Sequence, residues 1–79
     1  MEGKILIADD ETDIVVMLSQ FFQGKGYRIL TATNGVETLK QVENNPDIIL
    51  LDINMPGMDG LEVCQRIRDY VSCPILFLT

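Results

Sequence analysis

Short apolar runs alternate along this chain with longer segments that have helical periodicity. Four runs are mostly apolar and bounded by charged or turn-forming residues, which is typical of strands that are buried on both faces. The predicted strands are residues 4–8, 27–32, 47–51 and 75–78. The segments between them are long enough for helices and too long for hairpin turns, so neighbouring strands are predicted to run parallel.

Three helices are predicted between the strands. The first covers about residues 11–23, where apolar side chains recur on one helical stripe. The members of that stripe are Ile14, Val15, Leu18, Phe21 and Phe22. The second helix is predicted to begin at Asn34 and the third at Asp59, because each of these residues has a glutamate three positions later, as in a capping box.

The order βαβαβαβ predicts an α/β fold with one parallel sheet covered on both faces. Crossovers between parallel strands are right-handed, which leaves few possible strand orders. The flavodoxin-like order 2-1-3-4 places the first and third strands side by side, where the winding of the chain reverses. We expect this order here.

Acidic residues follow two of the predicted strands. Asp9 and Asp10 come directly after the first strand, and Asp52 comes directly after the third. In open α/β sheets, ligands bind beyond the carboxyl ends of the strands at the point where the winding reverses. We therefore expect the three carboxylates to meet at one edge of the sheet.

Three carboxylates in one place favour a hard divalent cation. Two unit negative charges about 4 Å apart repel by roughly 4 kcal/mol at an effective dielectric constant near 20. Mg²⁺ prefers oxygen ligands, so the predicted site combines Asp9, Asp10, Asp52 and a backbone carbonyl just beyond Asp52. Asp52 is then predicted to attack phosphorus and become an acyl phosphate. Thr79, at the end of the fourth strand, is predicted to donate its hydroxyl to a phosphoryl oxygen.

Several of these residues also have a purely structural interpretation. Acids at strand ends often cap helices or lie in solvated turns, and this interpretation remains open for Asp9 and Asp10 taken alone. Asp59 is interpreted as a helix cap. Cys64 and Cys73 are interpreted as packing side chains rather than redox groups.

Composition limits the range of functions. At 79 residues the chain has room for one domain. Its formal net charge of -6 gives a field that repels nucleic acid and anionic lipid, so we expect no direct contact with nucleic acid and none with a membrane. Two cysteines without a metal-binding spacing favour a reducing cytoplasm. No segment approaches the roughly 20 apolar residues of a membrane span.

Three segments, in chain order, resemble the response-regulator receiver domain of two-component signalling. Residues 6–11 read Leu-Ile-Ala-Asp-Asp-Glu, residues 52–60 read Asp-Ile-Asn-Met-Pro-Gly-Met-Asp-Gly, and residues 76–79 read Leu-Phe-Leu-Thr. The resemblance implies a flavodoxin-like fold that takes a phosphoryl group from a sensor histidine kinase, with at most self-phosphorylation and self-dephosphorylation as enzymatic activity. It also implies a role in transcription regulation.

The resemblance assigns roles to single residues. Asp52 matches the phosphoacceptor, and Asp9 and Asp10 match the acidic pocket that holds Mg²⁺. Asn54 matches the position whose backbone carbonyl completes the metal ligands. Thr79 matches the hydroxyl that contacts the phosphoryl group and moves when the domain switches.

Domains of this family run to roughly 120 residues with five strands and five helices. We therefore expect residues 1–79 to be the N-terminal two-thirds of a receiver domain, an incomplete fold lacking the last helix-strand-helix. The fourth strand would then be an apolar edge that favours pairing with another chain. We expect a homo-oligomer through this edge.

Two other functional classes stay open. A phosphatase of the haloacid dehalogenase kind also uses a strand-end aspartate and Mg²⁺, but it needs a second aspartate two residues later, where this chain has Asn54. An oligomerising interaction fragment without phosphotransfer is the other alternative.

Overall fold

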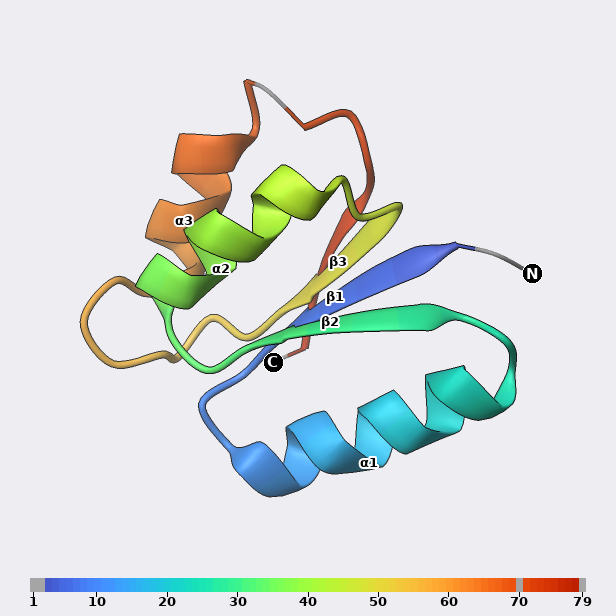
Figure 1. The fold of residues 1–79 in the computed structure, drawn as a ribbon. Helices are drawn as coiled ribbons and strands as arrows, with labels where there is room; N and C mark the ends of the chain where they lie inside the picture. The colour runs from blue at the N-terminus through green and yellow to red at the C-terminus, as the bar shows by residue number, and fades with distance from the viewer. Residues whose placement is uncertain (1–2, 70, 79) are drawn as a thin grey trace.

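The chain forms one parallel sheet with helices on both faces (Figure 1). The computed structural model describes residues 3–69 and 71–78. The strands are β1 (Lys4–Ala8), β2 (Arg28–Ala32), β3 (Ile48–Leu51) and β4 (Ile75–Phe77). The helices are α1 (Thr12–Gly24), α2 (Gly35–Gln41), the 3-10 turn η1 (Val42–Asn44) and α3 (Gly60–Ile67). These bounds agree with the predicted elements to within a few residues.

The strand order in the sheet is β2-β1-β3-β4, and every pair is parallel. The predicted fold class and strand order are therefore confirmed. β2 and β4 are the two edges of the sheet, while β1 and β3 lie in its middle. Because both central strands are covered on both faces, their side chains are apolar at every position after Lys4 instead of alternating with polar ones.

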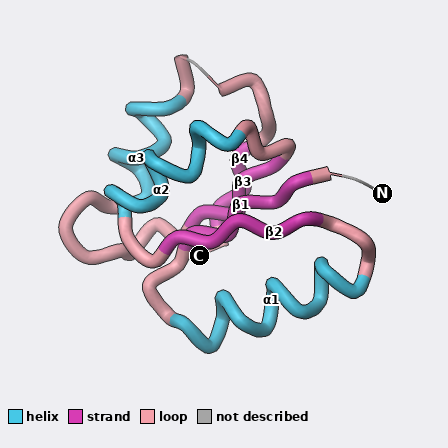
Figure 2. Tube along the Cα trace, viewed as in Figure 1, coloured by secondary structure: helices cyan, strands magenta, loops and turns pink. Residues whose placement is uncertain are grey.

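One helix packs on one face of the sheet and two pack on the other (Figures 1 and 2). Alternate residues of β1 point to opposite faces of the sheet and so belong to different apolar clusters. Ile5 and Ile7 join the cluster under α1, whereas Leu6 and Ala8 join the cluster under α2 and α3. The α1 cluster also contains Val15 of the helix itself. The sheet is thus the middle of three layers.

Several apolar helix residues lie largely in solvent, and one of them, Phe21, belongs to the stripe that was predicted for the first helix. In α1, Phe21 is 57% exposed, because Phe22 occupies the position against Tyr27 and Phe21 packs edge-on to the outer side of the Phe22 ring. In α2, Val36 is 55% exposed, and the buried helix position belongs to Thr38. The Thr38 hydroxyl can be buried because it donates to the backbone carbonyl of Asn34.

Both predicted helix caps are present. The side chain of Asn34 accepts from the backbone N–H of Glu37 at 2.8 Å, and that of Asp59 accepts from Glu62 at 2.9 Å. At the start of α2 the Glu37 carboxylate accepts from Thr33, not from the capping residue itself. Within the described residues, no helix is both long and apolar enough to cross a membrane.

Candidate functional site

Strand register brings the acidic residues of the candidate site together. Ala8 of β1 and Leu51 of β3 are register partners, so the next residues, Asp9 and Asp52, leave the sheet side by side. Two backbone hydrogen bonds fix this exit. The N–H of Asp52 donates to the carbonyl of Ala8 at 2.9 Å, and the N–H of Asp9 donates to the carbonyl of Ala32 in β2 at 3.0 Å. The site is therefore attached to three neighbouring strands.

The same kind of local turn orients each of the two buried carboxylates. Oδ1 of Asp9 accepts from the N–H of Glu11 at 2.9 Å, and Oδ1 of Asp52 accepts from the N–H of Asn54 at 3.1 Å. Each is an Asx turn, in which the side chain bonds the backbone two residues further along the chain. The pattern was not singled out in the sequence, although an aspartate directly after a strand is a recognisable signal for it.

The three carboxylates converge on one point. Asp9, Asp10 and Asp52 each offer a carboxylate oxygen, and these oxygens all lie within 4.8 Å of one another. Asp9 and Asp52 are almost completely buried, whereas Asp10 is exposed. Two charges at that separation repel by about 3 kcal/mol at an effective dielectric constant near 20, so the metal-free cluster is electrostatically unfavourable.

The pKa of the Asp9 carboxyl reflects its burial and this crowding. Burial raises the pKa of the Asp9 carboxyl above its ordinary value, and the nearby Asp52 and Asp10 carboxylates raise it further. The backbone hydrogen bond from Glu11 acts in the opposite direction and lowers the pKa. A divalent cation at this point would offset the negative charge of the carboxylates.

The loop after β3 carries Asn54, whose carbonyl was predicted to be a metal ligand. Met55, the next residue, is 5% exposed and packs in the core under α2 and α3. Gly57 has a φ of 78°, which favours glycine, and allows the loop to reverse. The N–H of Gly60 then donates to the carbonyl of Ile53 at 2.8 Å and closes the loop at its base.

Gly60 is also required by packing. A Cβ at this position would collide with the backbone of Asp52 and Ile53, so the start of α3 lies directly against the strand exit that carries the candidate phosphoacceptor. Thr79, the remaining predicted site residue, lies outside the described residues.

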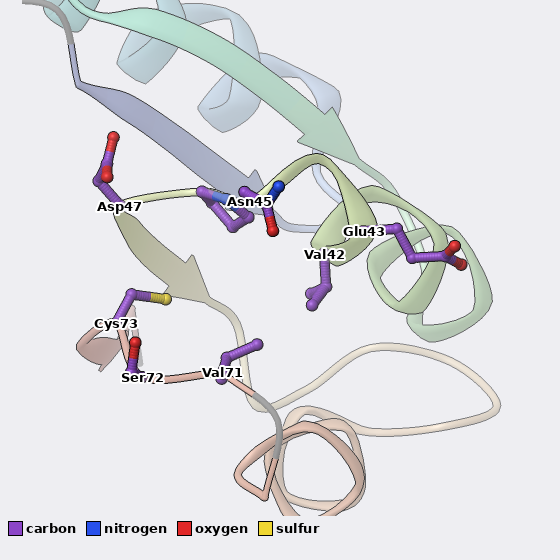
Figure 3. A pocket seen from close by; sticks show the side chains of 8 residues that line it. Val42, Glu43, Asn45, Asp47, Val71, Ser72 and Cys73 are labelled. Carbon is purple, nitrogen blue, oxygen red and sulfur yellow. The ribbon is translucent and has the colours of Figure 1, made fainter.

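A separate hollow lies at the opposite, amino end of β3 and β4 (Figure 3). It has a volume of about 470 Å³, and Asp47 and Cys73 on its wall precede these two strands. Oδ2 of Asp47 accepts from the backbone N–H of Lys4 at 2.7 Å, which connects that carboxylate with β1. Burial raises the pKa of the Cys73 thiol, so the thiol is kept in its neutral form. Neither Asp47 nor Cys73 belongs to the acidic cluster.

An open parallel sheet of flavodoxin-like order defines a doubly wound α/β domain, and its acidic cluster lies beyond adjacent strand ends, where such domains bind ligands. Comparison with known protein families identifies the family of this domain. The chain belongs to the response regulator receiver domain family, which matches residues 5–79.

Relatives and solved structures agree with this assignment. The alkaline phosphatase synthesis transcriptional regulatory protein PhoP of Bacillus subtilis is 44% identical, with the match covering 100% of this chain and 34% of that protein. The transcriptional regulatory protein ResD of the same organism is 47% identical, with 99% and 33% covered. The chain thus spans about a third of the length of these curated relatives.

Two solved structures illustrate the structural likeness. The N-terminal domain of a response regulator receiver protein from Methanoculleus marisnigri superposes with a TM-score of 0.91 at 38% identity, covering 98% of this chain and 66% of that one. The response regulator protein TrrA from Thermotoga maritima, described in complex with Mg(2+)-BeF, superposes with a TM-score of 0.79 at 47% identity, covering 85% and 59%.

Proposed function

We propose that this receiver domain accepts a phosphoryl group on Asp52 from a sensor histidine kinase, in a reaction that depends on Mg²⁺. The convergence of Asp9, Asp10 and Asp52 within 4.8 Å at the carboxyl edge of the sheet is the observation that carries this proposal. Family membership and the Mg(2+)-BeF complex of the Thermotoga relative support it.

The residues present fit a magnesium ion. Mg²⁺ takes oxygen ligands, commonly one or two carboxylates with several waters, and this cluster offers three carboxylates with one of them exposed. Asp9, Asp10, Asp52 and the backbone carbonyl of Asn54 would hold it. When bound, the ion supplies positive charge that offsets the carboxylates and the oxygens of the incoming phosphoryl group.

Asp52 is the nucleophile in the proposed reaction. One of its carboxylate oxygens attacks the phosphorus of a phosphohistidine, a P–O bond forms, and the P–N bond breaks with its electron pair going to the imidazole of the donor. The N–H of Asn54 holds Oδ1 of Asp52 and so fixes the orientation of the carboxylate before attack. The Thr79 hydroxyl is proposed to contact the transferred group.

A phosphatase of the haloacid dehalogenase kind is less well supported. That chemistry needs a carboxyl group two residues after the nucleophile as an acid and base, and Asn54 cannot transfer a proton in that way. Its backbone N–H instead takes part in the Asx turn that orients Asp52.

Acetyl phosphate provides the direct test. Incubation with acetyl phosphate and Mg²⁺ should add a single phosphoryl group, seen by intact mass spectrometry and removed by hydroxylamine as expected of an acyl phosphate. Asp52→Asn should abolish the addition, whereas Asp69→Asn, which removes an exposed carboxylate away from the site, should retain it. Addition that persists in Asp52→Asn would contradict the proposal, and steady turnover of phosphate esters would favour the phosphatase instead.

The wider context of the domain is also a proposal. Residues 1–79 would form the N-terminal two-thirds of a receiver domain within a cytoplasmic transcriptional regulator, as the names of the Bacillus relatives suggest. Cys64 and Cys73 are both free thiols, which suits a reducing compartment. We expect these residues to make no direct contact with nucleic acid.

We further propose that residues 1–79 on their own self-associate through β4. This strand is an edge of the sheet, and two of its three residues, Leu76 and Phe77, are 51% and 43% exposed. An apolar edge strand is a template for pairing with another chain. A second copy would cover both the strand edge and the exposed side chains.

Sedimentation velocity at micromolar concentration tests the association. The unmodified protein should sediment as a dimer or larger species, and Leu76→Lys should shift it to the monomer. Val36→Lys places the same charge on a comparably exposed valine of α2 and should leave association unchanged. A compact monomer for the unmodified protein would end the proposal.

A further inference from the structure

The first residue of α2, Gly35, lies against the loop that carries Asn54. A Cβ built on Gly35 would stand 2.7 Å from Cβ of Met58 and 2.8 Å from its backbone oxygen. Real Cβ atoms essentially never approach other atoms so closely, and neither of these atoms is the mobile end of a side chain. A residue with a Cβ would therefore have to displace the loop or the helix.

Local backbone conformation does not account for this glycine. Among the described residues only Gly26 and Gly57 are glycines with positive φ, so Gly35 has a conformation that other residues adopt readily. Glycine is disfavoured within helices relative to alanine because it loses more conformational freedom. The close approach of Met58 is thus the physical reason for a glycine at this position.

The start of α2 is a firm support for the loop. The N–H and hydroxyl of Thr33 both donate to the Glu37 carboxylate, at 2.8 and 2.6 Å. Asn34 caps the helix and accepts from Thr38 through its backbone carbonyl. This cap follows β2 directly, and the last residue of β2, Ala32, accepts the backbone N–H of Asp9. Gly35 is therefore joined through short, hydrogen-bonded segments to the Asp9 side of the site.

Besides the Asx turn at Asp52 and the hydrogen bond from the Met55 N–H to the carbonyl of Ile53, three contacts hold the loop after β3. Met55 is buried in the core, the N–H of Gly60 bonds to the carbonyl of Ile53, and Met58 packs against Gly35 and the core beneath it. Of these, the Met58 contact joins the loop to the first residue of α2. Asn54 is exposed between the first two attachments, so the position of its carbonyl depends on how tightly the loop is held.

We propose that Gly35 is a positioning residue for the acidic site: by lacking a Cβ it lets Met58 close onto α2 and holds the carbonyl of Asn54 in line with Asp9 and Asp52. This inference rests on the proposed Mg²⁺-dependent function. It assigns the first residue of α2, which touches none of the carboxylates, a role in the geometry of the metal site.

The ratio of affinities for Mg²⁺ and Ca²⁺ tests positioning separately from stability. Mg²⁺ demands near-ideal octahedral geometry, whereas Ca²⁺ accepts flexible arrangements. Gly35→Ala should weaken Mg²⁺ binding about tenfold, as substitutions of groups that orient metal ligands do, and weaken Ca²⁺ binding much less. Calorimetric titration of each ion, well below the unfolding temperature, gives both affinities. A substitution that merely destabilised the fold would leave their ratio unchanged.

Gly24→Ala is the matched control. Gly24 is also a helical glycine without positive φ, and a Cβ there would meet nothing within 4 Å. It should leave the affinities for both ions unchanged. A Gly35→Ala protein that behaves like this control in the ratio of affinities would overturn the inference.

Amide hydrogen exchange in the metal-free protein provides a readout that needs no ion. In Gly35→Ala the N–H of Gly60 should exchange about tenfold faster, because the loop has lost its attachment to α2, while the N–H of Asp52 in the strand ladder should keep its protection. Unchanged exchange at Gly60 would also overturn the inference. If the unmodified protein bound no Mg²⁺, the proposed function would fail, and exchange alone would decide whether Gly35 holds the loop.

Discussion

Neutralising Asp52 should stabilise the metal-free protein while removing its function. The carboxylates of Asp9 and Asp52 are both almost completely buried and have oxygens within 4.8 Å of each other. Their repulsion is about 3 kcal/mol at an effective dielectric constant near 20. Asp52→Asn removes it and keeps the shape of the side chain and an Oδ1 that accepts from Asn54. The substitution should leave the surrounding packing intact.

We expect a gain of about 1–2 kcal/mol in the free energy of unfolding, because water and salt at the open side of the site screen part of the repulsion. In a domain of this size, that gain corresponds to a rise of roughly 5–15 °C in the midpoint of thermal unfolding. Circular dichroism in the presence of a chelator measures the shift. Asp69→Asn, an exposed carboxylate away from the cluster, should change the midpoint little.

Addition of Mg²⁺ should reverse the ranking of the two proteins. An ion at 100 times its dissociation constant stabilises the protein that binds it by about 2.7 kcal/mol. The unmodified protein should gain this stability, and Asp52→Asn should gain little, because one carboxylate ligand is lost. The reasoning is refuted if Asp52→Asn unfolds at a lower temperature in chelator, or if Mg²⁺ stabilises both proteins equally.

Three further outcomes follow from the same structure. Because the pKa of Asp9 is raised, the folded state binds more protons than the unfolded state between pH 3.8 and that raised pKa. The stability of the metal-free protein should therefore increase as the pH falls through this window. Urea midpoints measured across pH should show this increase, and Asp9→Asn should abolish it. Gly60→Ala should cost about 3 kcal/mol or more in urea unfolding, since its Cβ collides with the backbone of Asp52, and a cost within error would contradict that packing. Asp59→Ala should lower the free energy of unfolding by about 1 kcal/mol in urea, because the backbone N–H of Glu62 loses its capping acceptor. Asp59→Asn can still accept this hydrogen bond and should keep most of that stability.

Hydrophobic periodicity was sufficient to predict the sheet and the meeting of the acids. β1 and β3 are apolar at successive positions, which indicates burial on both faces, and that burial requires parallel strands with helical crossovers. Once the strand order is 2-1-3-4, the residues after Ala8 and Leu51 must be neighbours. The position of Asp9 beside Asp52 therefore follows from topology and does not depend on side-chain detail.

Side-chain burial within the helices was predicted less well, because periodicity gives the direction of a stripe but not its width. Phe21 and Phe22 both fit the apolar stripe of α1, and the choice between them depends on the ring of Tyr27, which lies in the connection between α1 and β2. In α2 the polar Thr38 is buried, because its hydroxyl donates to the carbonyl of Asn34 on the preceding turn. Such choices depend on individual side-chain contacts, which a periodic pattern does not specify.

Residues that are unfavourable for local structure gather at the functional edge of the sheet. Gly35 and Gly60 each begin a helix, where other residues would be more stable, and Asp9 and Asp52 bury like charges side by side. Each of these choices lowers stability, and each is explained by what it permits: close approach of the loop after β3 in the first two cases, and an oxygen-rich cavity in the others. A sequence that is locally consistent elsewhere and inconsistent here has its function here. It follows that substitutions which repair the inconsistency, such as Asp52→Asn, should gain stability and lose metal binding together, whereas repair at an exposed helical glycine such as Gly24 should gain stability alone.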